Sequence, residues 1–216
     1  MGCASTASGA SRSLMTARPT GCESSSAERA LRRPSLIAAI DTHMCQLAGE
    51  ACDGIRPHPI TTRKFITEVM LPNAALGAKR AGRRLEQLEV AISPLVAVGE
   101  DDAELGERVR DVRARIAFYA STRTYRPVFD AHGWGGLVDR LHGLSTQQRW
   151  EEMPGHIPDE VLETIAVVGT YRDVARKILE RYGDFATRIE FSLPVRRPGD
   201  AERLRGVIRE LQGRGG

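Results

Sequence analysis

The stretch LIAAIDTHMCQLAGEACDGIRPHP, residues 36–59, decides the fold. Its first five residues form a short apolar run, which is typical of a strand buried on both faces. Asp41 or Thr42 can cap a short helix after this run, and we expect residues 49–51 to end that helix before a second strand starts at Asp53. A strand, a helix and a strand in such close succession predict βα units and a parallel sheet.

The same alternation continues along the chain. The next helix should be kinked or split at Pro72 and end at Gly82. A long apolar run over 88–98 then predicts one strand, interrupted at Ser93-Pro94 by a bulge or a shift. The remaining expected elements are a helix with an apolar stripe from Leu105 to Tyr119, short helices over 125–160, a helix over 161–168, a helix capped by a Thr170 and Asp173 box, a strand over 187–193 and a terminal helix over 200–211.

This pattern amounts to four strands, at 36–40, 53–56, 88–98 and 187–193. A closed (β/α)8 barrel needs about 250 residues. We therefore predict an α/β fold, an incomplete (β/α)8 TIM barrel of about four C-terminal βα units over residues 36–213, with a helical insertion at about 120–160. Residues 1–35, rich in Ser, Ala, Gly and Arg, have no apolar periodicity, so we expect a disordered or mis-started leader; the alternative, a targeting signal, would need an amphipathic helix that the scattered Gly and Pro do not support.

Composition narrows the classes of partner. The 31 basic and 28 acidic residues are interleaved, and a net charge of +3 does not predict nucleic-acid binding. Charges or prolines interrupt every apolar run well below the length of a membrane span, so we expect no membrane insertion and a reducing cytoplasm as the location. His43, Cys45, Cys52 and His58 match no zinc-site spacing, so we predict no metal.

Several short fragments, in this order, resemble the luciferase-like (bacterial luciferase type) oxidoreductases, particularly the deazaflavin branch that uses coenzyme F-420. The fragments are Ala38-Ala39-Ile40, His43-Met44-Cys45, Leu47-Ala48-Gly49-Glu50, Asp53-Gly54-Ile55, His58-Pro59, Glu68 to Pro72, Ile116 to Thr122, Tyr125 to Val128, His132 to Gly135 and Ala166 to Gly169. The resemblance implies a (β/α)8 barrel whose cofactor lies across the C-terminal ends of the strands. It begins at what looks like the fifth strand, so the family's first four strands have no counterpart here.

The resemblance also indicates a cofactor-binding loop. Family members commonly seat the phosphate-bearing tail of the cofactor after this strand, where free N–H groups and the helix dipole favour an anion. The corresponding residues are Ile40, Asp41, Thr42, His43 and Met44. Asp41-Thr42 stands where the family often has Gly-Pro, and Asp41 adds negative charge. The alternative is that Asp41 is an ordinary N-cap residue.

Two further residues are candidates for substrate binding. His58 ends the second predicted strand, where barrel enzymes place substrate-facing groups; the alternative is a loop histidine held between two prolines. Trp134 could line the substrate pocket or simply pack the insertion. His132-Gly133-Trp134-Gly135-Gly136 superficially resembles an oxyanion-hole run, but the chain has no G-x-S-x-G elbow, which argues against hydrolysis.

We therefore expect an oxidoreductase of the luciferase-like monooxygenase class that transfers hydride to or from a small organic substrate. The expected cofactor is coenzyme F-420, with FMN as the alternative. The rival interpretation is a non-catalytic remnant or assembly partner that binds no cofactor. An open sheet with edges at 36–40 and 187–193 and an uncovered apolar face further predicts self-association.

Overall fold

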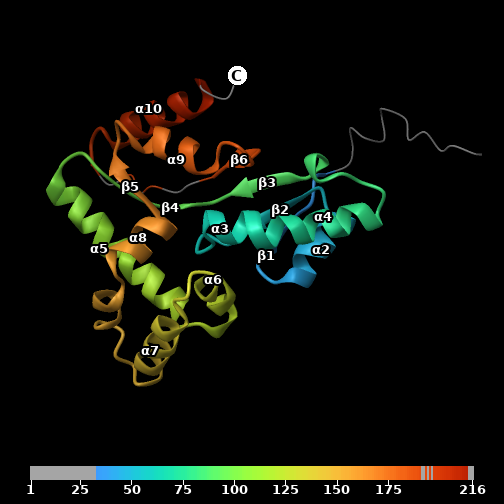
Figure 1. The fold of residues 1–216 in the computed structure, drawn as a ribbon. Coiled ribbons are helices and arrows are strands. Elements are labelled where there is room, and N and C mark those ends of the chain that lie inside the picture. Colours follow the sequence, from blue (N-terminus) through green and yellow to red (C-terminus); the bar gives the residue numbers. More distant parts are fainter. Residues whose placement is uncertain (1–32, 191–192, 194, 196, 214–216) are drawn as a thin grey trace, which may run out of the picture. The chain divides into compact units, whose positions relative to one another are not determined.

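The computed structural model describes residues 33–190, 193, 195 and 197–213, which belong, apart from Arg33, to a unit spanning Pro34–Gly216 (Figure 1). Most of the predicted leader, residues 1–32, lies outside the described residues. The strands are β1 Leu36–Ala39, β2 Gly54–Pro57, β3 Glu89–Ile92, β4 Leu95–Gly99, β5 Ala166–Thr170 and β6 Arg188–Ile189. The helices are α2 Thr42–Ala51, α3 Arg63–Phe65, α4 Leu71–Arg80, α5 Asp102–Ala120, α6 Arg126–Asp130, α7 Gly135–Thr146, α8 Asp159–Ile165, α9 Val174–Tyr182 and α10 Asp200–Gly213, with a π turn η1 Ile66–Met70 and 3-10 turns η2 Leu85–Gln87, η3 Arg123–Tyr125 and η4 Met153–His156.

All pairs between the described strands are parallel, as expected for βα units. One sheet has the order β1-β2-β3-β6 and the other consists of β4 and β5. Strands β1 and β6 are the outer strands of the first sheet, which confirms the predicted edges. Where a strand was expected over 187–193, the described residues form a strand at Arg188–Ile189 alone.

The strand predicted over 88–98 is two strands: the chain is interrupted at Ser93-Pro94, as expected, but the parts on either side do not belong to one strand with a bulge or a shift. Pro94 has no N–H to donate to a ladder, and the chain leaves one sheet and enters the other at Ser93-Pro94. Strand β3 pairs with β2 and β6, whereas β4 pairs with β5 (Figure 1).

The prediction of a helix over 161–168 is also wrong for its last three residues. Helix α8 stops at Ile165, and the following Ala-Val-Val-Gly-Thr run forms β5, whose five residues pair in register with β4. An apolar run this short does not distinguish a helix from a strand, and a partner strand decides the matter. The expected capping box is altered too, because Asp173, rather than Thr170, is the N-cap residue of α9.

Helix α2 ends at Ala51, within the expected residues 49–51, and Gly49 lies inside it. Gly49 allows a close approach of α4, since a Cβ on Gly49 would lie only 1.9 Å from the Ala74 carbonyl oxygen. At Pro72, where a kink or a split was expected, the helical chain is not split but changes type: the π turn ends at Met70, and Pro72 lies in the first turn of α4. Gly82 follows that helix with a φ of +67°, as a helix-ending glycine should.

The two faces of the four-stranded sheet differ in chemistry. Ala39, Ile55 and Val90 are buried in the core that also contains residues of α2 and α5, while the opposite face carries a row formed by Ala38, Arg56, Ala91 and Arg188. On that second face Arg56 contacts Glu190 at 2.5 Å, and Arg188 contacts Glu89 at 2.6 Å. The expectation of an uncovered apolar face is therefore wrong for this sheet: the face carries paired charges and small side chains.

The insertion consists of short helices joined by loops, as predicted. Its core is built from fully buried side chains, among them Phe129, Leu141 and Met153. It packs against α5, whose predicted apolar stripe is confirmed by the buried Val112 and Ile116.

Candidate functional site

The predicted cofactor loop, Ile40–Met44, follows β1 and leads into α2. Asp41 is the N-cap residue of this helix: its Oδ1 accepts the Met44 N–H at 2.9 Å, and its carbonyl oxygen accepts the Cys45 N–H at 3.0 Å. Asp41, Thr42 and His43 are exposed. The Asp41 carboxylate thus occupies an N–H that a phosphate would need and adds negative charge at the same helix end.

The register of the sheet brings this loop next to the predicted substrate residue. Ala39 is the partner of Pro57 in the β1–β2 pair, so Ile40 and His58 follow the carboxyl ends of neighbouring strands. The carboxyl ends of parallel strands are where α/β folds bind ligands. The structure therefore places the two predicted regions at one edge of the sheet.

Both ring nitrogens of His58 are used. Nδ1 accepts the Ile60 N–H at 3.2 Å, so Nε2 carries the proton and donates it to the Tyr125 hydroxyl at 3.2 Å. The His58 carbonyl oxygen accepts from both the N–H and the hydroxyl of Thr61, at 2.9 and 2.7 Å. His58 is therefore held in one orientation, and the group it presents outward is the phenol of Tyr125.

Three rings meet at this strand end. The His58 ring lies 4.5 Å from the Tyr125 ring and 4.7 Å from the Tyr119 ring, and the two tyrosines are 5.4 Å apart. Burial, together with the positive charge of Arg115, lowers the pKa of His58, so the imidazole is neutral near pH 7. Burial raises the pKa of Tyr125, followed by the effect of Tyr119, so its hydroxyl keeps its proton.

Trp134 takes part in a second set of contacts between the insertion and the β2–α3 loop, the loop that contains His58. Its ring stacks on His132 at 4.4 Å and 14°, and His132 Nε2 is 2.8 Å from the Thr62 hydroxyl. That hydroxyl also caps α3 by accepting the Phe65 N–H. Burial, then Lys64, lowers the pKa of His132. This geometry supports the packing interpretation of Trp134, because its ring holds the histidine that joins the insertion to the β2–α3 loop.

The two tyrosines carry no local signal in the sequence that marks them as site residues. Tyr119 and Tyr125 lie within the fragments that carry the family resemblance, but nothing in their local spacing indicates that they meet His58. A partner 67 positions away in the chain becomes visible only in the folded structure.

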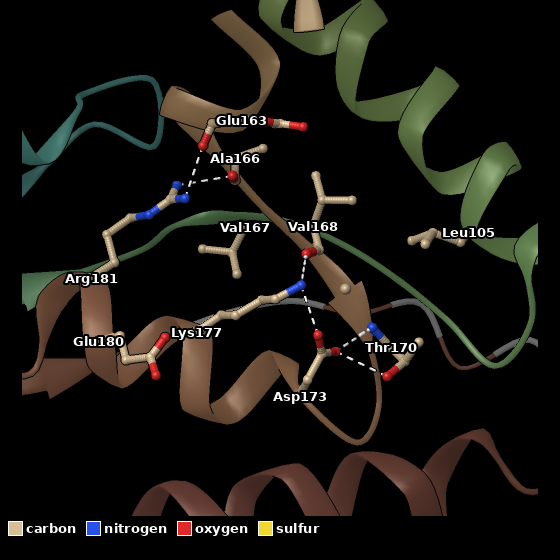
Figure 2. A pocket seen from close by; sticks show the side chains of 11 residues that line it. Leu105, Glu163, Ala166, Val167, Val168, Thr170, Asp173, Lys177, Glu180 and Arg181 are labelled. Carbon is tan, nitrogen blue, oxygen red and sulfur yellow. Dashed lines mark hydrogen bonds and ion pairs between the residues drawn. The ribbon is translucent and has the colours of Figure 1, made fainter. Parts of the chain in front are cut away.

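A cavity of about 670 Å³ lies elsewhere, between β5 and α9 (Figure 2). Figure 2 shows side chains of α9 reaching the open edge of β5. The two repeats match, because every second residue of a strand is about 6.6 Å along and every fourth residue of a helix about 6 Å along. The bonded pairs are Arg181 with the Ala166 carbonyl (2.9 Å), Lys177 with the Val168 carbonyl (2.9 Å) and the Asp173 carboxylate with the Thr170 N–H (2.6 Å).

This arrangement protects an edge strand, which would otherwise offer its backbone to another chain. Lys177 also pairs with Asp173 at 2.7 Å, and Arg181 also bonds the Glu163 carbonyl at 2.8 Å. The cations of the cavity are thus already bonded within the fold, and we assign the cavity a structural role.

Among the described residues, no group of three or more His, Cys, Asp or Glu side chains could hold a metal ion. Cys45 is fully buried, and burial, with the Asp41 carboxylate, raises the pKa of its thiol to about 11. None of the helices that the described residues form combines the length and apolar character needed to cross a bilayer.

Comparison with known proteins gives matches over most of the chain. The family model described as luciferase-like monooxygenase matches residues 6–188. The uncharacterized protein Rv1360 of Mycobacterium tuberculosis is 37% identical over 176 residues, which cover 82% of this chain and 51% of that protein. The 5,10-methylenetetrahydromethanopterin reductase of Methanolobus tindarius is 24% identical over 182 residues, which cover 83% of this chain and 54% of the enzyme.

Two solved structures share the fold. The coenzyme F-420 dependent tetrahydromethanopterin reductase from Methanopyrus kandleri matches with a TM-score of 0.66 and 19% identity, over 85% of this chain and 51% of its own. An F-420-dependent secondary alcohol dehydrogenase, in complex with an F-420-acetone adduct, matches with a TM-score of 0.52 and 13% identity, over 74% and 43%. The chain thus spans about half the length of the proteins it matches, and its fold is an incomplete (β/α)8 barrel.

Proposed function

Because the chain belongs to the luciferase-like monooxygenase family, we propose that it is the C-terminal part of an oxidoreductase that transfers hydride between coenzyme F-420 and a small organic substrate. The observation that carries this proposal is the family match over residues 6–188. Bound F-420 would accept or supply the hydride, and the protein would orient the reactants.

The choice of F-420 over FMN is supported by the relatives. Both solved structures named above are F-420-dependent enzymes, and the reductases of methanogens match in sequence as well. The substrate side of the proposed site contains His58, whereas Trp134 supports it from behind by holding His132. A cytoplasmic location remains a prediction.

The Ile40–Met44 loop, as described, does not fit the phosphate-bearing tail of the cofactor, because the Asp41 carboxylate occupies the helix end. We therefore expect weak binding of F-420 by this chain, seen as little quenching of cofactor fluorescence at micromolar concentrations. Asp41→Ser keeps an N-cap oxygen and removes the charge. If the loop takes the tail, this variant should bind F-420 more tightly than the parent chain.

A matched control for Asp41→Ser is Asp101→Ser, which makes the same change at the N-cap of α5. Equal affinity of the parent chain and both variants would refute the loop assignment. Tight F-420 binding by the parent chain would show that the rest of the barrel is not needed for binding, and would refute the expectation that an incomplete barrel binds the cofactor weakly.

We further propose that the open sheet is completed by a second copy of the chain. Two four-stranded sheets supply the eight strands of a closed barrel if the β6 edge of one copy joins the β1 edge of the other. Because the exposed sheet face carries paired charges, we expect little binding of a hydrophobic dye. A monomer in sedimentation equilibrium would refute the pairing and favour the alternative, a remnant or assembly partner without cofactor.

A further inference from the structure

The ring cluster at the end of β2 has hydrogen-bond donors that the fold does not use. The Tyr125 oxygen accepts from His58, so its own O–H is available to a further acceptor. The Tyr119 hydroxyl forms no hydrogen bond to any other described residue, although its half-buried ring contacts His58 and Tyr125. Two phenol donors therefore lie together at the edge of the sheet where ligands bind in this type of fold.

The charge around these donors is positive. Arg115 precedes Tyr119 by one helical turn on α5, so both side chains lie on the same face of the helix. Arg115 is exposed and forms no ion pair with any carboxylate in the described part of the chain, and it acts on His58 electrostatically. No acidic side chain is among the groups that shift the pKa values of His58 or Tyr125. The field therefore favours a negative oxygen.

Apolar ring surface continues outward from the donors. Phe118 lies 5.6 Å from Tyr119, and Trp150 lies 6.2 Å from Phe118. Both are large exposed side chains, at 53% and 46% of their full accessibility. Exposed aromatic rings that touch each other beside polar groups can stack a planar ligand.

We propose that Arg115, Tyr119 and Tyr125 form a binding site for the carboxylate of a small ring-bearing molecule, with His58 as the residue that positions Tyr125. The two phenol O–H groups and the guanidinium donate to the carboxylate oxygens, and the Phe118–Trp150 surface takes the ring. The inference rests on the proposed function only in identifying the occupant as the substrate. The donors themselves are a property of this chain.

Benzoate is a suitable probe for the test, with the chain labelled at its tyrosine rings and followed by NMR. We expect the Tyr119 and Tyr125 signals to shift saturably with benzoate, less with acetate, which lacks the ring, and not with benzylamine, which has the opposite charge. Arg115→Gln and Tyr119→Phe should each weaken benzoate binding about fivefold, the size of an exposed charged contact. Equal binding of benzylamine, or unchanged binding by both variants, would overturn the site.

Two variants serve as matched controls. Arg110→Gln removes an exposed arginine from another face of α5, and Tyr171→Phe removes a phenol outside the cluster. Both should bind benzoate as the parent chain does, and a loss as large as that of Arg115→Gln would overturn the assignment.

A final titration separates substrate from cofactor. If oxidised F-420 competes with benzoate, the carboxylate is the cofactor's own; if the two bind independently, it belongs to the substrate, and either result supports the site. Because weak F-420 binding is expected, this titration extends to millimolar F-420: benzoate binding with no F-420 binding even there would refute the proposed cofactor and leave the carboxylate site standing.

Discussion

The contact between α2 and α4 predicts that Gly77→Ala destabilises the protein, although alanine is the better helix former. Gly77 lies inside α4, and a Cβ there would be 1.8 Å from the Gln46 carbonyl oxygen on α2. Gly49 makes the reciprocal approach to α4 from the other helix. Because α2 begins at the Ile40–Met44 loop, this glycine pair also helps to position the proposed cofactor loop.

The size of the effect follows from two opposing contributions. Helix propensity alone would stabilise the alanine variant by up to about 1 kcal/mol. The new methyl group falls short of an ordinary 3.4 Å contact by about 1.6 Å, against backbone that cannot rotate away, and overpacking of this kind costs about 1–3 kcal/mol. Since this clash lies at the upper end of that range, we expect a net loss of about 2 kcal/mol, or a Tm lower by roughly 4–8 °C.

Thermal and urea unfolding of the purified chain, followed by circular dichroism, measures this difference. Gly143→Ala is the matched control, because it lies inside α7 and nothing is within 4 Å of the added Cβ. We expect Gly143→Ala to raise the stability by up to about 1 kcal/mol. A Gly77→Ala variant as stable as the parent chain would refute the close packing of α2 on α4.

Three further outcomes follow from the structure. The lowered pKa values of His58 and His132 mean that the folded state disfavours their protonation, so this contribution to stability is complete above the unfolded value of 6.5 and is lost as the pH falls below it. His58→Gln and His132→Gln should each reduce the drop in Tm between pH 8 and pH 5, and an unchanged drop in both variants would contradict the lowered pKa values. The buried Cys45 should resist a thiol reagent at pH 8 that labels Cys52, tested by mass spectrometry in a Cys3→Ser, Cys22→Ser background, and equal labelling of the two would show that Cys45 is accessible. Lys177→Met removes the bond to the Val168 carbonyl at the β5 edge and should lower the Tm by a few degrees, whereas Arg176→Met, one position away and exposed, should change it little; similar losses in both would argue against edge protection.

The sequence by itself determined the local elements and their parallel arrangement. The apolar run at 36–40, the cap at Asp41 or Thr42 and the stripe of α5 are local patterns, and each depends on residues within a few positions of one another. Such patterns predict elements because backbone geometry and side-chain spacing are set locally. The place of the Ile40–Met44 loop, proposed to bind the cofactor, and of His58 at strand ends follows from the same order of elements.

Only the tertiary structure decided which segments pair and what each side chain meets. The division of 88–98 between two sheets and the change of 166–168 from helix to strand both depend on a partner strand about 70 positions away in the sequence. The charge pairs on the open sheet face and the bond between His58 and Tyr125 join residues from separate elements. These contacts arise from folding, because a hydrogen bond or an ion pair needs two partners, and the local sequence around one partner does not determine which distant residue is the other.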